Sequence, residues 1–402
     1  LRGASLWCLG QRKSLKSINL QNTQVVEMDR ATKHAEKVAI GDVVACKPHK
    51  QACIRHLKDL ERQGTKDFPY FWKPEKSEHI LNFAETLTVA EGESPKPVKL
   101  YGHQCFDLGV PMGWVNRDGY RRFRRSYESM ARQNGKTFRN GIRGTYLAAF
   151  GGYHYGKLFT AATKKRQARL AWDEMAKFIR IDPDLTEFFR IQDYKSLITA
   201  LNTNCTIEAL SKESGLDDGF RSIFNSIDEI HQHRDNSIYK ALYNGTRALK
   251  ETLNSMITTR GRNLNSFCYE MDKYCLNILS GAAVAEDFFV DIYTLDEEDD
   301  PFDSNVWIKA NPYLCQTDFG IEIQRFDAET ARNMGGDELA DYLTKCCNMW
   351  VHDHERKYID AEKFVECGSD RTLKDFVGRS CYVGLDLSSG GDLTTLALEF
   401  ET

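Results

Sequence analysis

The sequence predicts an α/β protein built on a mostly parallel sheet, and two observations carry this prediction. From residue 157 onward, short apolar runs alternate with helical patterns, as expected for parallel strands joined by crossover helices. Residues 129–137 read Ser-Met-Ala-Arg-Gln-Asn-Gly-Lys-Thr, a polar turn followed by a helical stretch. Such a turn is typical of a phosphate-binding loop at the end of a strand.

The composition bounds the class of protein. The chain has 402 residues, of which 41% are hydrophobic and 28% charged, an ordinary balance for a globular protein of two or three domains. The net charge of −4 neither favours nor excludes nucleic-acid binding, so that binding can be argued only from local clusters of basic residues. No run of 18 apolar residues and no secretory signal is found, so neither a membrane span nor export is expected. The twelve cysteines include no Cys-x-x-Cys pair, which favours reduced, mostly buried thiols over a zinc site or disulfide framework.

The N-terminal part divides into an arm and a helical region. Residues 1–28 are polar and lack periodicity, so they are treated as an arm without assigned function. Residues 29–98 contain helix-like stretches, which predict an N-terminal helical lid. Gln104 follows shortly before the phosphate loop, and its amide offers the donor and acceptor that suit a purine edge. A buried structural glutamine fits the sequence equally well.

The phosphate loop supplies three kinds of group. Gly135 lets backbone N–H groups close on phosphate oxygens, and Lys136 brings a positive charge to the outer phosphates. The Thr137 hydroxyl can bind Mg²⁺. The usual pattern has a glycine where this chain has Met130, so the spacing alone fits a surface turn about as well.

Two later strands end in polar residues. An apolar run over 222–229 ends in Asp228 and Glu229, which suits an aspartate that holds Mg²⁺ and a glutamate that orients or deprotonates water. Alone, such an acidic pair is usually just a helix start. The strand over 255–261 ends in hydroxyls and a glycine. Together with the phosphate loop, three strand ends of suitable character converge.

Basic residues gather in two places. One cluster lies at 117–125, interleaved with aromatic residues, and another at 164–169 opens a helical stretch. Such mixtures can hold phosphates and stack on bases, although a solvated charged face is the commoner explanation. Both clusters are candidates for nucleic-acid contact.

These residues together resemble the large terminase subunit of tailed bacteriophages, a genome-packaging ATPase and nuclease. The resemblance runs from about Asp29 to the end of the chain and rests on the order and spacing of many short motifs. The family's phosphate loop often lacks the first glycine, which accounts for Met130. The motifs are Ala45-Cys46-Lys47, Arg55-His56-Leu57, Gln104, Arg121-Arg122-Phe123, residues 131–137, Asp228-Glu229-Ile230-His231, Ile257-Thr258-Thr259, Asn263-Leu264-Asn265-Ser266, Cys268-Tyr269-Glu270, Ala310-Asn311-Pro312 and residues 384–389.

The resemblance implies a fold in several parts. A P-loop NTPase core of the RecA/ASCE type would occupy residues 99–295, and a linker with a helical connection residues 296–378. Strand patterns at 381–387 and 393–400 would form the first hairpin of an RNase H-like nuclease domain over 379–402. Such a nuclease holds metal ions with clustered carboxylates, and later strands must supply the rest of them. Endonuclease activity is therefore expected only in a longer form of the chain.

The resemblance also implies a role for each site residue. Glu229 would activate water, and Arg132 would stabilise the γ-phosphate as an arginine finger supplied in cis. Thr258 and Thr259 would couple hydrolysis to DNA movement. The residues expected to bind the nucleotide are Gln104, Arg132, Gln133, Asn134, Gly135, Lys136, Thr137 and Asp228. The expected metal ligands are Thr137, Asp228 and, in the nuclease, Asp386.

The implied activity is ATP hydrolysis that drives double-stranded DNA into a procapsid, with metal-dependent cleavage of concatemeric DNA. The cofactors would be ATP and Mg²⁺, with Mg²⁺ or Mn²⁺ for the nuclease. The partners would be the portal protein, a small terminase subunit and further copies of the chain in a ring, in the cytoplasm of the bacterial host. Two alternatives stay open: a P-loop DNA helicase or remodelling ATPase, against which Asp386 argues, and a truncated prophage relic that binds nucleotide or DNA without turnover.

Overall fold

The computed structural model describes residues 28–89, 91–92, 94–211, 221–351, 365–368, 371–387 and 394–400. The chain forms two compact units, Leu1–His352 and Asp353–Thr402. Nearly all of the predicted N-terminal arm lies outside the described residues. None of the described helices is long and apolar enough to cross a membrane.

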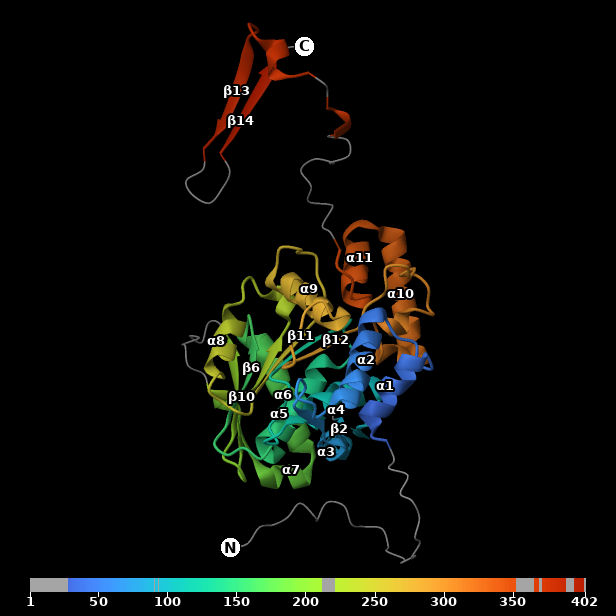
Figure 1. The fold of residues 1–402 in the computed structure, drawn as a ribbon, viewed down its shortest axis with the longest axis vertical. Coiled ribbons are helices and arrows are strands. Elements are labelled where there is room, and N and C mark those ends of the chain that lie inside the picture. The colour runs from blue at the N-terminus through green and yellow to red at the C-terminus, as the bar shows by residue number, and fades with distance from the viewer. Residues whose placement is uncertain are drawn as a thin grey trace, which may run out of the picture. The chain divides into compact units, whose positions relative to one another are not determined.

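An eight-stranded sheet forms the centre of the first unit (Figure 1). Six of its strands run parallel, and the last two extend one edge in antiparallel pairing. The mostly parallel sheet that the sequence predicted is therefore confirmed. The order across the sheet is β12 (Phe288–Ile292), β5 (Arg125–Ser129), β11 (Leu253–Thr258), β10 (Ser222–Asp228), β6 (Lys157–Ala162), β9 (Thr206–Ser211), β8 (Leu197–Ala200) and β7 (Phe189–Gln192).

Helices cover both faces of this sheet and enclose an apolar core on each. Adjacent residues of one strand point to opposite faces, so Leu158 lies in the first core and Phe159 in the second. The first core is closed by α3 (Pro74–Thr86), α4 (Gly102–Gly113), α5 (Lys136–Phe150), α6 (Lys165–Ile181) and α7 (Pro183–Phe188). The second is closed by α1 (Arg30–Ile40), α2 (Lys47–Arg62), α8 (Ser237–Gly245) and α9 (Phe267–Ser280). Strands buried on both faces read as the continuous apolar runs seen in the sequence.

The N-terminal helices have well-defined ends. The Asp29 side chain accepts the N–H of Thr32 and caps α1, which ends at Gly41 with φ +90°. Pro48 stands in the first turn of α2, where its missing N–H costs nothing. A small antiparallel sheet of β1 (Tyr70–Trp72) and β4 (Trp114–Asn116) joins this region to the rest. A second such sheet, of β2 (Thr88–Val89) and β3 (Lys96–Pro97), lies within the region.

A third, smaller core lies in the chain that follows β12. It gathers apolar side chains around Trp307 and Tyr342, and it includes Ala131 from the loop after β5. The chain beyond the sheet therefore packs directly on that loop. The elements are η5 (Trp307–Lys309), η6 (Leu314–Gln316), α10 (Asp318–Met334), α11 (Gly336–Asp341) and the π-helix η7 (Tyr342–Cys346).

The arginines before β5 hold this strand to its neighbours. Arg122 is fully buried and pairs with Asp59 at 2.6 Å and with Glu286. Arg125 pairs with Asp287 at 2.8 Å. Removing such a buried charge from its partners is costly, so these arginines are not free for phosphate contacts. The first basic cluster is thus largely structural.

In the second unit, β13 (Cys381–Asp386) and β14 (Thr395–Phe400) pair antiparallel, as the sequence predicted. The register runs from Cys381 opposite Phe400 to Asp386 opposite Thr395. Phe376, which ends the short helix η9 (Leu373–Phe376), stacks on Phe400 with 4.4 Å between ring centroids. Residues 388–393, between the two strands, lie outside the described residues.

Candidate nucleotide-binding site

The carboxyl ends of β5, β10 and β11 meet at one edge of the large sheet. The register places Thr258 beside Ser129, and Asp228 beside Ile257, so the three strands end level with one another. Ligands of open parallel sheets bind outside this edge. A cavity of about 600 Å³ lies there, lined by residues 132–138, Glu229 and side chains of α6.

The loop between β5 and α5 has the backbone of a phosphate-binding loop. Gly135 has φ +72°, a conformation that L side chains rarely adopt, and Gln133 has φ +60°. Helix α5 begins directly afterwards, at Lys136. Because the first N–H groups of a helix have no partner within it, they are available to bind an anion in the cavity.

Lys136 is held inside the loop. Its Nζ donates to the carbonyl oxygens of Met130 and Ala131, 2.8 Å away in each case. Burial lowers the pKa of Lys136 to about 8, while the carboxylates of Glu229 and Asp228 oppose this shift. The ammonium group is thus positioned among hydrogen-bond acceptors at the N-terminus of α5.

Asp228 and Glu229 face the loop from the end of β10. The Thr137 hydroxyl donates to Asp228 Oδ2 at 3.0 Å, and the Glu229 N–H donates to Asp228 Oδ1 at 2.7 Å. Burial and the neighbouring Glu229 raise the pKa of Asp228 to about 6. Glu229 has φ +53°, a strained conformation for a residue with a side chain, of the kind that gathers at functional sites.

His231 connects Glu229 with the end of β11, a contact that the sequence did not reveal. Its Nδ1 lies 3.1 Å from Glu229 Oε2, 3.1 Å from Thr258 Oγ1 and 3.3 Å from Thr259 Oγ1. Burial lowers the pKa of His231 to about 4, so the ring is neutral. One imidazole therefore joins the predicted coupling residues to the predicted water-activating carboxylate.

Arg132 and Gln104 differ in their access to the cavity. Arg132 is exposed and lines the cavity together with Lys136 and Glu229. Gln104 is buried at the start of α4, where its Oε1 accepts the N–H of Tyr101 at 3.0 Å. Gln104 therefore caps a helix, the structural role that the sequence left open, and its Nε2 remains directed toward Gly135.

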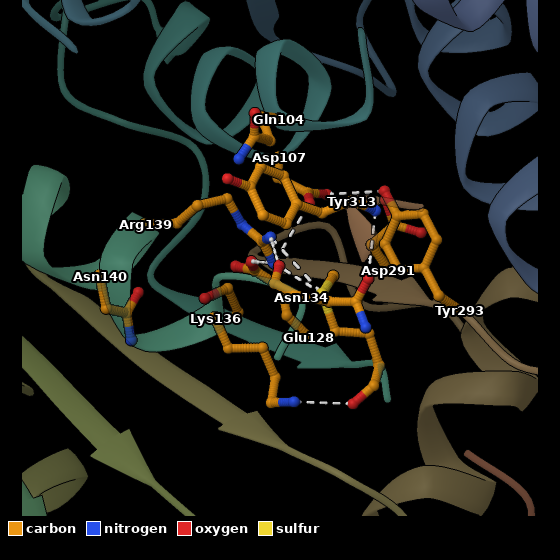
Figure 2. Close-up of polar contacts among 12 residues, drawn as sticks. Gln104, Asp107, Glu128, Asn134, Lys136, Arg139, Asn140, Asp291, Tyr293 and Tyr313 are labelled. Carbon is orange, nitrogen blue, oxygen red and sulfur yellow. Dashed lines mark hydrogen bonds and ion pairs between the residues drawn. The ribbon is translucent and has the colours of Figure 1, made fainter. Parts of the chain in front are cut away.

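Asn134 ties the loop to the chain beyond the sheet (Figure 2). Its Oδ1 accepts the N–H groups of Tyr313 and Leu314, both at 3.1 Å. Its Nδ2 donates to Asn311 Oδ1 at 2.9 Å. The side chain of Asn134 thus shapes the loop through contacts with residues that follow nearly 180 positions later.

A buried charge cluster, formed by Asp107, Glu128, Arg139 and Arg143, adjoins the loop, and Figure 2 labels the first three of these side chains. Arg143 pairs with Glu128 at 2.6 Å, and Arg139 lies 3.4 Å from the carboxylates of both Glu128 and Asp107. Arg139 also donates to the carbonyl oxygen of Asn134 at 3.2 Å. Burial raises the pKa of Asp107. The only sequence signal for this cluster was the presence of charged residues on a helix that must face a buried sheet.

The sheet, the loop before α5 and the acidic end of β10 define a P-loop ATPase. The family model described as "Terminase large subunit, ATPase domain" matches residues 102–277, and "Terminase large subunit, endonuclease domain" matches residues 282–402. This chain belongs to the terminase large subunit family and carries both of its domains.

Individual proteins are similar to parts of this chain. Protein YmfN of Escherichia coli K12 is 29% identical over 175 residues, which cover 42% of this chain and 37% of that protein. The terminase large subunit of Enterobacteria phage HK97 is 25% identical over 279 residues, 68% of this chain and 53% of that protein. The chain thus spans about half or less of the length of these relatives. The crystal structure of the HK97 bacteriophage large terminase has the same fold, with a TM-score of 0.60 at 20% identity over 81% of this chain and 65% of that one.

The endonuclease match changes one expectation. On the sequence alone, nuclease residues were predicted only at 379–402, and endonuclease activity was predicted only for a longer form of the chain. That restriction is not supported, because the endonuclease model matches from residue 282 onward. Asp386, the predicted nuclease ligand, ends β13 and is exposed.

Proposed function

We propose that this chain is the ATP-hydrolysing large subunit of a packaging motor from a tailed phage or prophage. Its work would be to move double-stranded DNA into a procapsid and to cleave concatemeric DNA. The observation that carries the proposal is that Lys136, Thr137 and Glu229 line one cavity in a member of the terminase family. Asp228 joins them through its hydrogen bond from the Thr137 hydroxyl.

ATP and Mg²⁺ fit the groups at this cavity. The Lys136 ammonium and the free N–H groups of α5 suit the phosphates. The oxygens of Thr137 and Asp228, 3.0 Å apart, are the hard ligands that Mg²⁺ prefers, and the ion would neutralise charge on the phosphates. The backbone of Gln133, Asn134 and Gly135 would complete the cradle.

The remaining residues would act on the reaction itself. Glu229 would orient the attacking water and accept its proton. Arg132, exposed at the same cavity, would stabilise the γ-phosphate in cis. His231 contacts Glu229, Thr258 and Thr259, so a change at Glu229 would reach the end of β11 and couple hydrolysis to DNA movement.

Gln104 would read the adenine through one atom only. Its Oε1 is engaged by the Tyr101 N–H, which leaves Nε2 as a donor for an acceptor nitrogen of the base. This donor lies beside Gly135, so it would approach the nucleotide from the side of the loop.

The second basic cluster supplies a surface for DNA. Lys164, Lys165 and Arg166 are exposed around the N-terminus of α6 and form no ion pair with the described residues. Positive charges at a helix N-terminus oppose the helix dipole, so they destabilise α6 slightly. An anionic partner such as the DNA backbone would offset this cost.

Double-stranded DNA is expected to raise ATP hydrolysis by the purified chain. Replacing Lys164, Lys165 and Arg166 with alanine should leave basal hydrolysis intact but weaken the stimulation. If all three touch phosphates, the slope of log affinity against log salt should flatten by about 2.7, since each contact contributes about 0.9. The measurement is steady-state hydrolysis together with DNA binding at several salt concentrations.

The matched control replaces Lys240 and Arg247, which are also exposed, with alanine. It should respond to DNA as the wild type does. Hydrolysis that DNA leaves unchanged in the wild-type chain would count against a packaging motor. Strand separation without stimulated translocation would indicate a helicase instead.

The endonuclease activity is expected to depend on Asp386. Asp386→Ala should abolish Mg²⁺- or Mn²⁺-dependent cleavage of plasmid DNA, because a lost carboxylate weakens metal binding at the scissile phosphate. ATP hydrolysis should persist. Agarose gels of cleaved plasmid provide the measurement, with Glu366→Gln, at another exposed acid of the second unit, as control. Equal cleavage by Asp386→Ala and wild type would remove Asp386 from the metal site.

The binding partners and the cellular location of this chain are further proposals, based on its family. The portal protein, a small terminase subunit and other copies of the chain in a ring would assemble with it in the cytoplasm of the bacterial host. Within the chain, we propose that residues 29–98 act as a lid and 99–295 as the ATPase core. We propose that residues 379–402 contribute one hairpin to the endonuclease region, which the family model begins at residue 282.

A further inference from the structure

We propose that His34, His49 and Cys53 form a binding site for a divalent transition metal of the zinc class, separate from the nucleotide site. The three side chains are buried, and their ligand atoms all lie within 4.8 Å of one another. The site could not be predicted from the sequence, because its ligands come from two helices and follow no Cys-x-x-Cys spacing.

The backbone presents the three ligands from two sides. His49 and Cys53 are four residues apart on α2, so they lie on the same face of that helix. His34 projects from α1, which packs against α2. An i, i+4 pair plus one residue from a neighbouring helix is a chelating arrangement that needs no loop.

The distances suit a tetrahedral ion. His34 Nε2 and His49 Nε2 are 3.0 Å apart, and Cys53 Sγ is 3.7 Å from His49 Nε2. With metal–nitrogen bonds of about 2.0–2.1 Å and a metal–sulfur bond of about 2.3 Å, tetrahedral angles require separations of about 3.3 Å and about 3.6 Å. Shifts of a few tenths of an ångström would therefore admit the ion.

The hydrogen bonds around His49 direct a lone pair into this space. Its Nδ1 lies 2.8 and 2.9 Å from the two carboxylate oxygens of Asp291, a fully buried residue of β12. With its proton on Nδ1, His49 turns an unprotonated Nε2 toward His34 and Cys53. A carboxylate behind a histidine is the usual arrangement around metal-ligating imidazoles.

His34 and the approach to the site are also defined. A Cβ on Gly102 would lie 2.4 Å from His34 Nδ1, so the bare backbone of Gly102 is what makes room for the ring. His34 and His49 line a cavity of about 500 Å³. This cavity gives an ion a path inward and leaves room for water as the fourth ligand.

The test uses cobalt as a spectroscopic substitute for zinc. The purified full chain, stripped with a chelator, is titrated with Co²⁺ and followed by visible and near-ultraviolet absorption. We expect one equivalent to bind with the bands of tetrahedral cobalt and a thiolate-to-cobalt charge-transfer band, and Zn²⁺ to displace it. Cobalt at Thr137 and Asp228 would have oxygen ligands only and would give no charge-transfer band.

Two variants separate this site from other thiols. Cys53→Ser should lose the charge-transfer band, whereas Cys367→Ser, at an exposed cysteine of the second unit, should keep it. Circular dichroism of both variants in metal-free buffer checks their folding. A wild-type chain without the band, or a band that survives Cys53→Ser, would overturn the proposal.

X-ray absorption of the zinc-loaded wild-type chain provides a measurement that needs no variant. The proposal expects one sulfur and two imidazole ligands at the zinc. Oxygen-only coordination would overturn it and would leave the contact between His34 and His49 as a simple hydrogen bond between neutral rings. Bound zinc should also raise the melting temperature, since a ligand of the folded state stabilises it by mass action.

Discussion

Lys136→Ala should lower ATP turnover about 100- to 1000-fold, the usual cost of removing one group that stabilises charge in the transition state. The Lys136 Nζ donates to the loop carbonyl oxygens of Met130 and Ala131, and the carboxylates of Asp228 and Glu229 act on its charge from the end of β10. Steady-state hydrolysis with and without double-stranded DNA measures the effect. Because Lys136 is buried, its loss also removes one donor from the carbonyl oxygens of Met130 and Ala131, and among the described contacts only Ala131 keeps another, from Asn134 Nδ2 at 3.3 Å. Thermal unfolding should therefore be measured beside the assay.

The control for this prediction is Lys240→Ala, at an exposed lysine of α8. Its turnover should equal that of the wild type. If folded Lys136→Ala kept more than a tenth of wild-type turnover, the phosphate-binding role of Lys136 would be wrong. Absent turnover in both Lys136→Ala and wild type would point to a motor that works only as an assembled ring.

Arg143→Leu should destabilise the fold by about 3–5 kcal/mol, the cost of removing one partner from a buried ion pair, because Glu128 would keep, among the described residues, only the more distant Arg139 at 3.4 Å. Arg143 and Glu128 are fully buried and 2.6 Å apart. Arg143 also donates to Asn140 Oδ1 at 2.9 Å, so its removal leaves a buried amide oxygen with one donor fewer. Urea denaturation followed by circular dichroism measures the change in the free energy of unfolding.

A double-mutant cycle tests whether the pair itself is responsible. Glu128→Leu combined with Arg143→Leu should be less destabilised than the sum of the single variants, because the double variant no longer buries Glu128 beside a missing partner. Arg166→Leu, at an exposed position, should change stability by less than about 0.5 kcal/mol. Additive single effects would show that Arg143 stabilises through packing alone.

The sequence alone predicts the parts of the candidate site whose residues are neighbours in the chain or end adjacent strands. Phosphate binding requires a glycine, a lysine and a hydroxyl in one turn, so Gly135, Lys136 and Thr137 could be predicted together. Asp228 and Glu229 could be predicted because parallel strands end at a common edge. His231 could not, because its contacts depend on the positive φ of Glu229 and on the register between β10 and β11.

Charged and polar side chains were harder to interpret, because a sequence does not show which groups they contact. Arg122 belonged to a cluster that fitted nucleic acid, yet its partners Asp59 and Glu286 lie far away in the chain. Gln104 offered both a base-reading and a structural role, and its contact with Tyr101 depends on where α4 begins. Tertiary packing decides the pairing of Arg122, whereas the helix boundary decides that of Gln104.

The contacts of Asn134 have a thermodynamic consequence for the chain beyond the sheet. Asn134 bonds to Asn311, Tyr313 and Leu314, and the Arg132 N–H donates to the carbonyl of Lys345 at 2.9 Å. Linkage between two sites is reciprocal. If these bonds strengthen nucleotide binding by some free energy, bound nucleotide stabilises the docking of this segment by the same free energy. The segment lies inside the region matched by the endonuclease model, so the proposed nucleotide site is joined to that region by these hydrogen bonds.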